Sequence, residues 1–229
     1  MATLSNWLSA AEQLAQGAAR STNDSVLVYE ASLTEYGQDR IVMTAEKGGS
    51  RYLLVIGGGA LYAELQGEEH TAGELTYKVC PLTTANRLVL NTHLDYTKPR
   101  AFGTQIATIG LGDRLGLASP GHIKTVAGRN IRPILAQQSI RELNLTNRTY
   151  EDVLDAAAFA VFQEGYKDGW GADGDHLKTI ADIEMALRLG FSMLTLDASE
   201  FIDNEAASAD DAEVARRYEQ LDEAYRTRL

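Results

Sequence analysis

Apolar and polar residues follow two different rhythms along the chain, and the change falls near residue 100. Residues 1–20 carry apolar side chains at helical spacing. Three β-rich segments follow at Ser25–Ser32, Asp39–Glu46 and Arg51–Gly58, with Gly, Asn and Asp between them. Short connections of this composition favour antiparallel pairing. The sequence therefore predicts a small α+β region over residues 1–100.

From Gln105 onward, short apolar strands alternate with helices. The expected strands lie in QIATIGLGD, RPILAQQS, GWGADGDHLK and FSMLTLDAS, the third being strand and loop. One helix between them is opened by Thr149 and Asp152, which match a capping box with Asp in place of Glu. Another ends at Gly190, a typical C-terminal cap. Four such β/α units predict a parallel sheet.

Polar residues gather after each of these strands. They are Asp113 and Arg114, then Gln137 to Arg141, then Asp173 to Lys178, then Asp197. Barrel enzymes build their sites at the carboxyl ends of strands that face one centre, whereas an open sheet would spread such clusters out. We therefore expect residues 101–229 to form about the first four units of a (β/α)₈ TIM-barrel-like fold.

The length of the second region bears on this fold. A closed eight-unit barrel needs roughly 200 residues or more, and the chain after residue 100 is too short for it. Its amphipathic last segment, from Ser208 onward, reads as a helix without the strands it should pack against. We expect the chain to be a fragment that holds the first half of the barrel.

Composition indicates an ordinary globular protein and excludes several partners. Of 229 residues, 45% are hydrophobic and 23% charged, and the net charge is −11. This charge argues against a sequence-independent grip on nucleic acid or on an anionic membrane, and no stretch approaches the roughly 20 apolar residues of a membrane span. The single cysteine, Cys80, cannot form an internal disulfide. We expect a cytoplasmic protein with neither nucleic-acid nor membrane partners.

Several conspicuous residues are better explained by structure than by chemistry. Gly57–Gly59 lacks the spacing of a phosphate-binding loop and predicts a turn. Cys80 has no histidine near it in sequence and is expected to be a small buried residue. His70 and His93 are expected to be structural, and His122 to take a surface or capping role at the start of its helix.

Four sequence blocks resemble the tagaturonate epimerase family. They are GLGDRLGLASPGHI, PILAQQSIREL, FQEGYKDGWGADGDHLKT and DIEMALRLGFSMLTLD, and the resemblance runs from about Phe102 to Asp203. It implies a metal-dependent isomerase that interconverts the keto-uronates tagaturonate and fructuronate in hexuronate catabolism. Family members are much longer than this chain, and further metal-ligating histidines are expected in their second barrel half.

The family's substrates differ in configuration at C4, which carries a hydroxyl and lies β to the ketone. Enolisation does not acidify the C–H bond at C4, but a β-hydroxyketone is set up for retro-aldol cleavage. A base would take the C4 hydroxyl proton, and the C3–C4 bond would open to an enediolate and an aldehyde. The aldehyde would turn before the bond reforms, and a divalent metal would stabilise the enediolate as a Lewis acid.

His176 is the candidate metal ligand, since imidazole binds zinc, nickel and other divalent ions. A hydrogen-bonded structural histidine is the alternative, and the resemblance favours the metal. The sequence does not distinguish zinc, nickel and manganese. Asp175 is the candidate catalytic base beside it. Neighbours on a regular strand point to opposite faces, so the two act together only where the strand has ended or bulged, which Gly171 and Gly174 make easier.

The remaining polar residues are candidates for binding the substrate. Arg141 and Arg114 suit a carboxylate because a guanidinium binds it in bidentate fashion, with a structural ion pair as the alternative. Lys178 could pair with the same carboxylate or form a Schiff base. The full set of expected substrate-binding residues is Arg141, Gln137, Gln138, Lys178, Asp173 and Arg114. We expect one of the two glutamines to point into the barrel and the other into the helix layer.

Asp173 competes with Asp175 for the role of base, since alternation places both on one face of the strand, and loop capping is the alternative for either. Two other functions stay open. A metal-dependent aldolase or sugar isomerase could use the same site on another ketose. A non-catalytic module could bind a sugar acid or a partner chain, and a homo-oligomer is expected if the inner face of the half-barrel stays uncovered.

Overall fold

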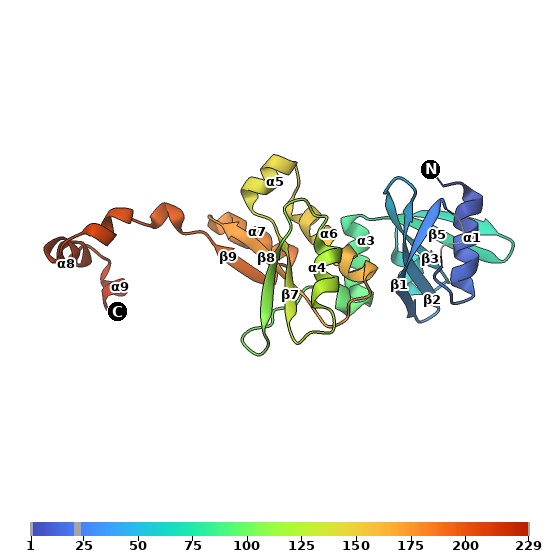
Figure 1. The fold of residues 1–229 in the computed structure, drawn as a ribbon, viewed down its shortest axis with the longest axis horizontal. Coiled ribbons are helices and arrows are strands. Elements are labelled where there is room, and N and C mark those ends of the chain that lie inside the picture. The colour runs from blue at the N-terminus through green and yellow to red at the C-terminus, as the bar shows by residue number, and fades with distance from the viewer. Residues whose placement is uncertain (1, 21–23, 229) are drawn as a thin grey trace. The chain divides into compact units, whose positions relative to one another are not determined.

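The chain is described by a computed structural model that covers residues 2–20 and 24–228 (Figure 1). Contacts between residues divide it into a larger unit that ends at Thr195 and a second unit that begins at Leu196. In chain order the elements of the larger unit are α1 (Leu4–Ala15), β1 (Val26–Tyr36), β2 (Asp39–Glu46), β3 (Arg51–Ile56), α2 (Ala60–Glu64), β4 (Glu68–Ala72), β5 (Leu75–Pro81), α3 (Thr84–His93), the 3-10 helix η1 (Asp95–Thr97), β6 (Thr108–Gly112), α4 (Ser119–Val126), β7 (Arg132–Gln137), α5 (Ile140–Thr146), α6 (Tyr150–Gln163), β8 (Gly171–Leu177), α7 (Ile180–Leu189) and β9 (Met193–Leu196), whose last residue opens the second unit.

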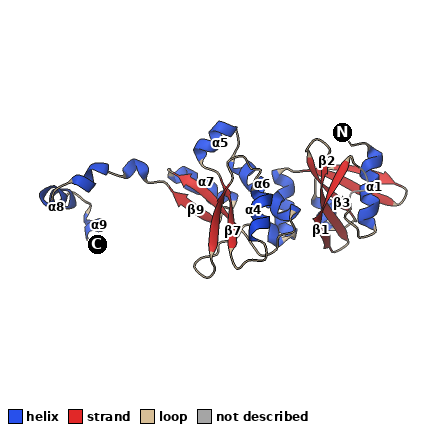
Figure 2. Cartoon of the chain, in the orientation of Figure 1, coloured by secondary structure: helices blue, strands red, loops and turns tan. Residues whose placement is uncertain are grey.

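The first of the two sheets (Figure 2) has the order β1-β2-β3-β5-β4. Its pairs are antiparallel, which the sequence predicted for the first three strands, whereas β4 and β5 were not expected. Residues on successive positions enter different cores. Ile41 and Met43 pack with α2, α3 and α6, whereas Val42 between them packs with α1. The strict alternation follows from the pleat of a strand buried on both faces.

The second sheet has the order β6-β7-β8-β9, and the pairs β6–β7 and β7–β8 are parallel. Its strands lie in the four segments expected, and side chains of α4, α6 and α7 share one core with Leu135 of β7 and Ala172 of β8. The chain is thus a mixed α/β protein with one antiparallel and one parallel sheet, and its described residues form no closed barrel. The change between sheets falls between Pro81 and Thr108, and a domain boundary near residue 100 stays a prediction.

Helix α6 belongs to both cores. Phe159 and Phe162 pack with the antiparallel sheet, while Ala158 and Val161 pack with the parallel sheet. Every residue from Ala157 to Gln163 is buried. The expected capping box at Thr149 and Asp152 opens this helix, and both reciprocal hydrogen bonds are present. One helix therefore fixes how the two sheets of the larger unit pack.

Two expectations about helices were wrong or incomplete. Helix α5, which begins at Ile140 shortly after the end of β7, was not expected from the sequence. The C-terminal segment is not one helix, because α8 (Asp211–Glu219) and α9 (Glu223–Arg226) are separate helices in the second unit. That unit also holds the 3-10 helices η2 (Ser199–Phe201) and η3 (Asn204–Ser208). Asp222 caps the second helix by accepting from the Ala224 amide, and this local cap competes with continuation of α8.

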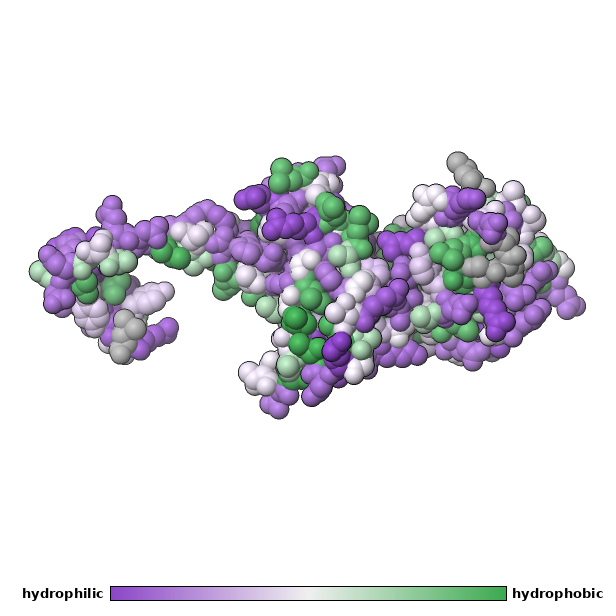
Figure 3. Space-filling view, in the orientation of Figure 1, coloured by the Kyte–Doolittle hydropathy of each residue, from purple (hydrophilic) through white to green (hydrophobic). Residues whose placement is uncertain are grey.

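The outer strands of the parallel sheet leave apolar side chains in contact with solvent. Ile109 of β6 is 40% exposed and Met193 of β9 is 42% exposed. Hydrophobic side chains are also visible on the middle part of the molecule in Figure 3. The homo-oligomer expected from the sequence stays a prediction. No helix within residues 2–20 and 24–228 is long and apolar enough to cross a membrane, and the cytoplasmic location likewise stays a prediction.

The glycines at positions 57 to 59 form a turn, as expected, and a carboxylate of the chain itself fills it. Asp39 accepts from the amide of Gly59 at 2.7 Å and from that of Tyr62 at 3.0 Å. The Asp39 carboxylate thereby caps the N-terminus of the short helix α2. Cys80 is fully buried, and burial raises the pKa of its thiol to about 12, which is the wrong direction for a nucleophile.

Candidate functional site

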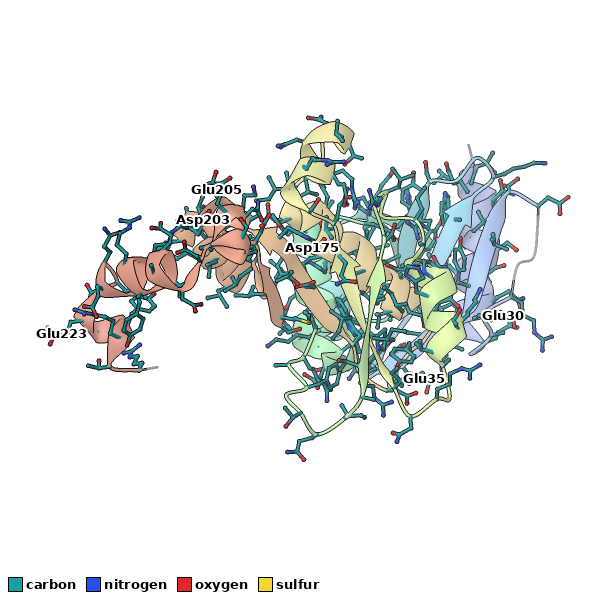
Figure 4. All side chains as sticks on the ribbon, turned by 60° about the vertical axis from the view of Figure 1, so that its left-hand side comes forward. Glu30, Glu35, Asp175, Asp203, Glu205 and Glu223 are labelled. Carbon is teal, nitrogen blue, oxygen red and sulfur yellow. The ribbon has the colours of Figure 1, made fainter. Side chains whose placement is uncertain are left out.

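Asp175 and His176, near the carboxyl end of β8, contact each other directly. The distance between Asp175 Oδ1 and His176 Nδ1 is 2.7 Å. The Asp175 side chain is 17% exposed and the imidazole is 58% exposed, and Figure 4 labels Asp175 on the ribbon. A nearly buried carboxylate thus holds one nitrogen of an imidazole whose other side is open to solvent.

The two side chains meet because His176 has a left-handed backbone, with φ 56°. This conformation breaks the alternation of the strand, as the sequence analysis required. The left-handed residue is His176 itself, and neither Gly171 nor Gly174, the glycines expected to ease such a break, has a positive φ. Gly174 instead allows close packing, because a Cβ there would lie 3.1 Å from the Cβ of Ala186 on α7.

The neighbouring strand β7 has a similar break at Ala136, whose φ is 58°. Leu135 and Ala136 consequently both belong to the core under the helices, and Gln137 turns toward β8. A non-glycine residue in this region costs of order 1 kcal/mol or more, and such strain concentrates at functional sites. Two adjacent strands carry it near their carboxyl ends, which marks this edge of the sheet.

Asp173 is fully buried and ties three strands together. Its carboxylate accepts from Gln137 Nε2 of β7 at 2.8 Å and from Thr195 Oγ1 of β9 at 2.8 Å. The side chain of Gln137 also packs closely against Gly110 of β6. A Cβ atom at position 110 would lie 2.8 Å from the side-chain oxygen Oε1 of Gln137. The substrate-binding role expected of Asp173 stays a prediction. In the structure its carboxylate links side chains of β7 and β9 to β8, and we call this arrangement the Asp173 clamp.

Gln138 binds other partners than Gln137 does, and the expectation that one glutamine points into a barrel and the other into the helix layer stays a prediction. Gln138 is fully buried. Its Nε2 donates to the Arg114 carbonyl oxygen at 2.7 Å and to Thr146 Oγ1 at 3.0 Å, and its Oε1 accepts from Arg148 Nη1 at 2.5 Å. Through these bonds the side-chain amide of Gln138 holds the loop after β6 and the helix α5 in place. The contact with substrate expected of Gln138 stays a prediction.

The three candidate cations lie at the surface of the same end of the sheet. Arg114 is 75% exposed and pairs with Glu142 at 2.8 Å, which is the ion pair weighed as its alternative role. Arg141 is exposed on α5, a helix that packs against β8. Lys178 is exposed directly after β8. Their roles toward a substrate carboxylate stay predictions.

The environment shifts two ionisable groups of this edge in opposite directions. Burial raises the pKa of Asp175, with Asp173 and Glu142 adding to the effect and the His176 hydrogen bond opposing it. Burial alone would also raise the pKa of Asp113, but the amides of Leu117, Ala118, Leu115 and Ser119 together bring it below its ordinary value. Asp113 therefore acts as a fixed anion that shapes the loop between β6 and α4.

His176 fits a metal ligand in one respect. Metal-binding histidines usually donate their second ring N–H to a carboxylate, and the contact between Nδ1 and Asp175 leaves Nε2 for a metal ion. Within the part of the chain that the structure describes, no group of three or more His, Cys, Asp or Glu side chains could hold a metal. The other ligands would have to come from outside it.

The contacts of His93 and His70 fit the structural roles expected of these two histidines, whereas the buried Nδ1 of His122 does not fit the surface or capping role expected of it. His93 joins Tyr36 Oη at 3.1 Å and Glu64 at 3.0 Å. The ring of His70 packs against Tyr77 at 5.2 Å between centroids. His122 lies within α4 and is partly buried, with no partner for Nδ1 among the described residues.

Three residues that contact this edge were missed. Tyr150 donates to the backbone oxygen of Asp175 at 3.2 Å, Thr195 binds Asp173, and Arg148 binds Gln138. Thr195 carried a signal, because it is the single polar residue of the apolar strand MLTL. Tyr150 and Arg148 flank a helix cap, and their partners are distant in sequence, so the sequence held no comparable signal.

A polar pair at the carboxyl end of a parallel strand, above a helix-covered sheet, is typical of α/β enzymes. The family model described as UxaE, tagaturonate epimerase, matches residues 29–229. The chain therefore belongs to the tagaturonate epimerase family.

Individual relatives agree with this assignment. The chain is 38% identical over 177 residues to the tagaturonate/fructuronate epimerase of Thermotoga maritima, across 77% of this chain and 36% of that protein. It also resembles crystal structures of the fructuronate-tagaturonate epimerase UxaE from Cohnella laeviribosi. The native structure is 55% identical with TM-score 0.82, over 99% of this chain and 44% of that one. A structure with one glycerol is 56% identical with TM-score 0.82, over 96% and 43%. The chain thus spans less than half the length of these relatives.

Proposed function

We propose that this chain forms the N-terminal part of a metal-dependent epimerase that interconverts D-tagaturonate and D-fructuronate at C4 in hexuronate catabolism. The observation that carries the proposal is the contact of 2.7 Å between Asp175 Oδ1 and His176 Nδ1 near the carboxyl end of a parallel strand. Membership of the tagaturonate epimerase family supplies the substrate class.

In this proposal, the four strands β6 to β9 are the first half of a (β/α)₈ barrel. Two observations support it: the strands follow one another in chain order, and the outer strands β6 and β9 keep exposed apolar side chains. A barrel would bury both edges. The longer relatives have more than enough additional chain to supply the remaining units.

Asp175 acts as the base that takes the C4 hydroxyl proton. Electrons of the C3–C4 bond then move to C3, which gives the enediolate of C2 and C3 and leaves C4 as an aldehyde carbon. Rotation of the aldehyde presents its opposite face, the bond reforms, and the new alkoxide recovers the proton. Burial raises the pKa of Asp175, and a carboxylate of higher pKa is a stronger base.

His176 would hold the metal through Nε2, with zinc, nickel and manganese as candidates. A bound divalent cation would supply Lewis-acid stabilisation of negative charge on the substrate oxygens. Asp175 keeps the imidazole oriented in the resting site and releases it when the substrate hydroxyl takes its place. Arg114, Arg141 and Lys178 supply positive charge at the same edge for the substrate carboxylate.

The test is an epimerase assay of the protein that carries this sequence, with Asp175→Asn, His176→Asn and, as a matched control, Glu151→Gln on the exposed start of α6. We expect both site variants to lose at least about 100-fold in turnover, the range typical of a general base, and the control to keep its rate. Chelation should abolish activity, and a divalent metal should restore it. Full turnover by Asp175→Asn would refute the assignment, and release of two shorter carbonyl products would favour an aldolase.

A further inference from the structure

We propose that Tyr150 is a positioning residue for the Asp175–His176 pair, because its hydroxyl holds the peptide group that joins these two residues. Tyr150 Oη donates to the backbone oxygen of Asp175 at 3.2 Å. The catalytic meaning of this contact rests on the proposed function, but the contact itself can be tested on the geometry of His176 alone.

Tyr150 is well placed to act as a fixed anchor. It is the first residue of α6, directly after the capping box of Thr149 and Asp152. The side chain is 4% exposed, and its ring meets that of Phe191 edge-on, with centroids 5.1 Å apart and planes at 85°. The backbone of α6 and the ring of Phe191 both restrict the Tyr150 side chain. Its hydroxyl is therefore directed at the backbone oxygen of Asp175 on β8.

The anchored carbonyl belongs to the peptide that precedes His176. The residue pairs between β7 and β8 run only to Leu135 and Ala172, so Asp175 lies beyond that ladder. The angle φ of His176 describes the rotation of this residue relative to that peptide. Its value is 56°, which lies in the left-handed region. Such a conformation persists only where surrounding contacts hold it, and the tyrosine hydroxyl supplies one.

The hydroxyl is a dependable donor in this place. Burial raises the pKa of Tyr150 above its ordinary value, and the nearby carboxylates of Asp175, Asp182 and Asp173 raise it further. The phenol is therefore protonated, and able to donate, at neutral pH. If the anchor is lost, the Asp175 peptide can turn, and the imidazole moves away from the carboxylate.

The experiment compares Tyr150→Phe with Tyr166→Phe in the 229-residue chain. Tyr166 is also a buried tyrosine, and its hydroxyl has no hydrogen-bond partner among the described residues, so its removal controls for loss of a buried hydroxyl. The readout is the tautomer of the His176 ring, from long-range ¹H–¹⁵N correlations recorded at a mildly alkaline pH. The His176→Gln variant assigns the signal, and Asp175→Asn shows the ring without its carboxylate.

We expect the unmodified chain and Tyr166→Phe to hold His176 with the proton on Nδ1. Tyr150→Phe should shift the ratio of tautomers about threefold to tenfold toward Nε2–H, which corresponds to the net contribution of one hydrogen bond. An unchanged ratio in a folded Tyr150→Phe variant would overturn the proposal, as would an equal shift in Tyr166→Phe.

A second variant separates the hydrogen bond from ring packing. Phe191→Leu removes the ring contact but leaves the Tyr150 hydroxyl, and we expect its tautomer ratio to stay close to that of the unmodified chain. A shift as large as that expected of Tyr150→Phe would assign the effect to packing and overturn the role of the hydroxyl. A shift in Phe191→Leu would overturn the role of the hydroxyl even if Tyr150→Phe does not fold. None of these readouts depends on epimerase activity.

Discussion

Gly165 lies directly against the carbonyl oxygen of Ala31, and a Cβ atom at position 165 would overlap that oxygen. Ala31 sits in the irregular part of β1, between Tyr29 and Thr34, where the pairing with β2 shifts register. Gly165 follows the end of α6. The bulge of an antiparallel strand thus rests on the helix that also covers the parallel sheet.

Gly165→Ala is expected to cost about 3 kcal/mol or more of unfolding free energy, because it adds a backbone clash to the strain of a left-handed residue. Gly103→Ala is the matched control. Gly103 has φ 56°, almost the value of 57° at Gly165, but a Cβ at position 103 would have no atom within 4 Å, so only the strain of about 1 to 2 kcal/mol remains. Equal losses in denaturant unfolding would refute the close contact.

Arg87→Ala should destabilise the protein by about 3 to 5 kcal/mol, since it leaves a buried carboxylate without its cation. Arg87 Nε of α3 lies 2.5 Å from Asp155 Oδ1 of α6, and the side chains are only 4% and 13% exposed. The pair Arg100–Asp95 serves as the control, because its side chains are 51% and 78% exposed and exposed pairs contribute about 0 to 1 kcal/mol. Thermal or denaturant unfolding of Arg87→Ala and Arg100→Ala measures both, and similar small losses would contradict the buried pair.

Asp113→Asn should weaken the acid sensitivity of folding. The pKa of Asp113 is lower in the folded protein than in the unfolded chain, so its stabilising contribution is complete above the unfolded pKa of about 3.9. That contribution is lost as the pH falls through the folded pKa. Unfolding free energy measured from pH 7 downward should fall less steeply below about pH 4 to 5 in the variant than in the unmodified chain. Parallel curves would mean that the amide donors do not stabilise the anion.

Thr195→Val should cost about 1 to 3 kcal/mol, because the buried carboxylate of Asp173 loses one of its donors. Thr92→Val is the control, since the Thr92 hydroxyl is exposed and bonds only to the backbone of its own helix. Double-mutant cycles with Asp173→Asn, read by denaturant unfolding, should give a coupling energy for Thr195 and none for Thr92. A cycle without coupling at Thr195 would show that the clamp across β8 and β9 contributes nothing.

The sequence predicted those elements whose signals are local. The β-rich segment DRIVMTAE matches β2 residue for residue, and Thr149 with Asp152 marked the start of α6. The strand and loop pattern of GWGADGDHLK placed Asp175 and His176 near the end of a strand. In each case the information lies within a few neighbouring residues, either as β-rich composition or as a cap.

What the sequence could not predict depends on contacts between distant residues. The left-handed backbone of Ala136 and His176 could not be located from composition, since few non-glycine residues of any type adopt it. The partners of Gln138 come from a loop, from α5 and from the segment before α6. Helix α5 was missed because its seven residues are too few to display a full amphipathic period.

Helix α6 gives the larger unit a property that neither sheet has alone. Its last seven residues are buried on all sides, so neither sheet can separate from it without exposing apolar surface that the other sheet does not cover. Melting of the antiparallel layer and of the parallel layer is thereby thermodynamically linked. A destabilising substitution far from Asp175, at Ile41 or Leu53 for example, therefore lowers the fraction of molecules in which the candidate site is folded.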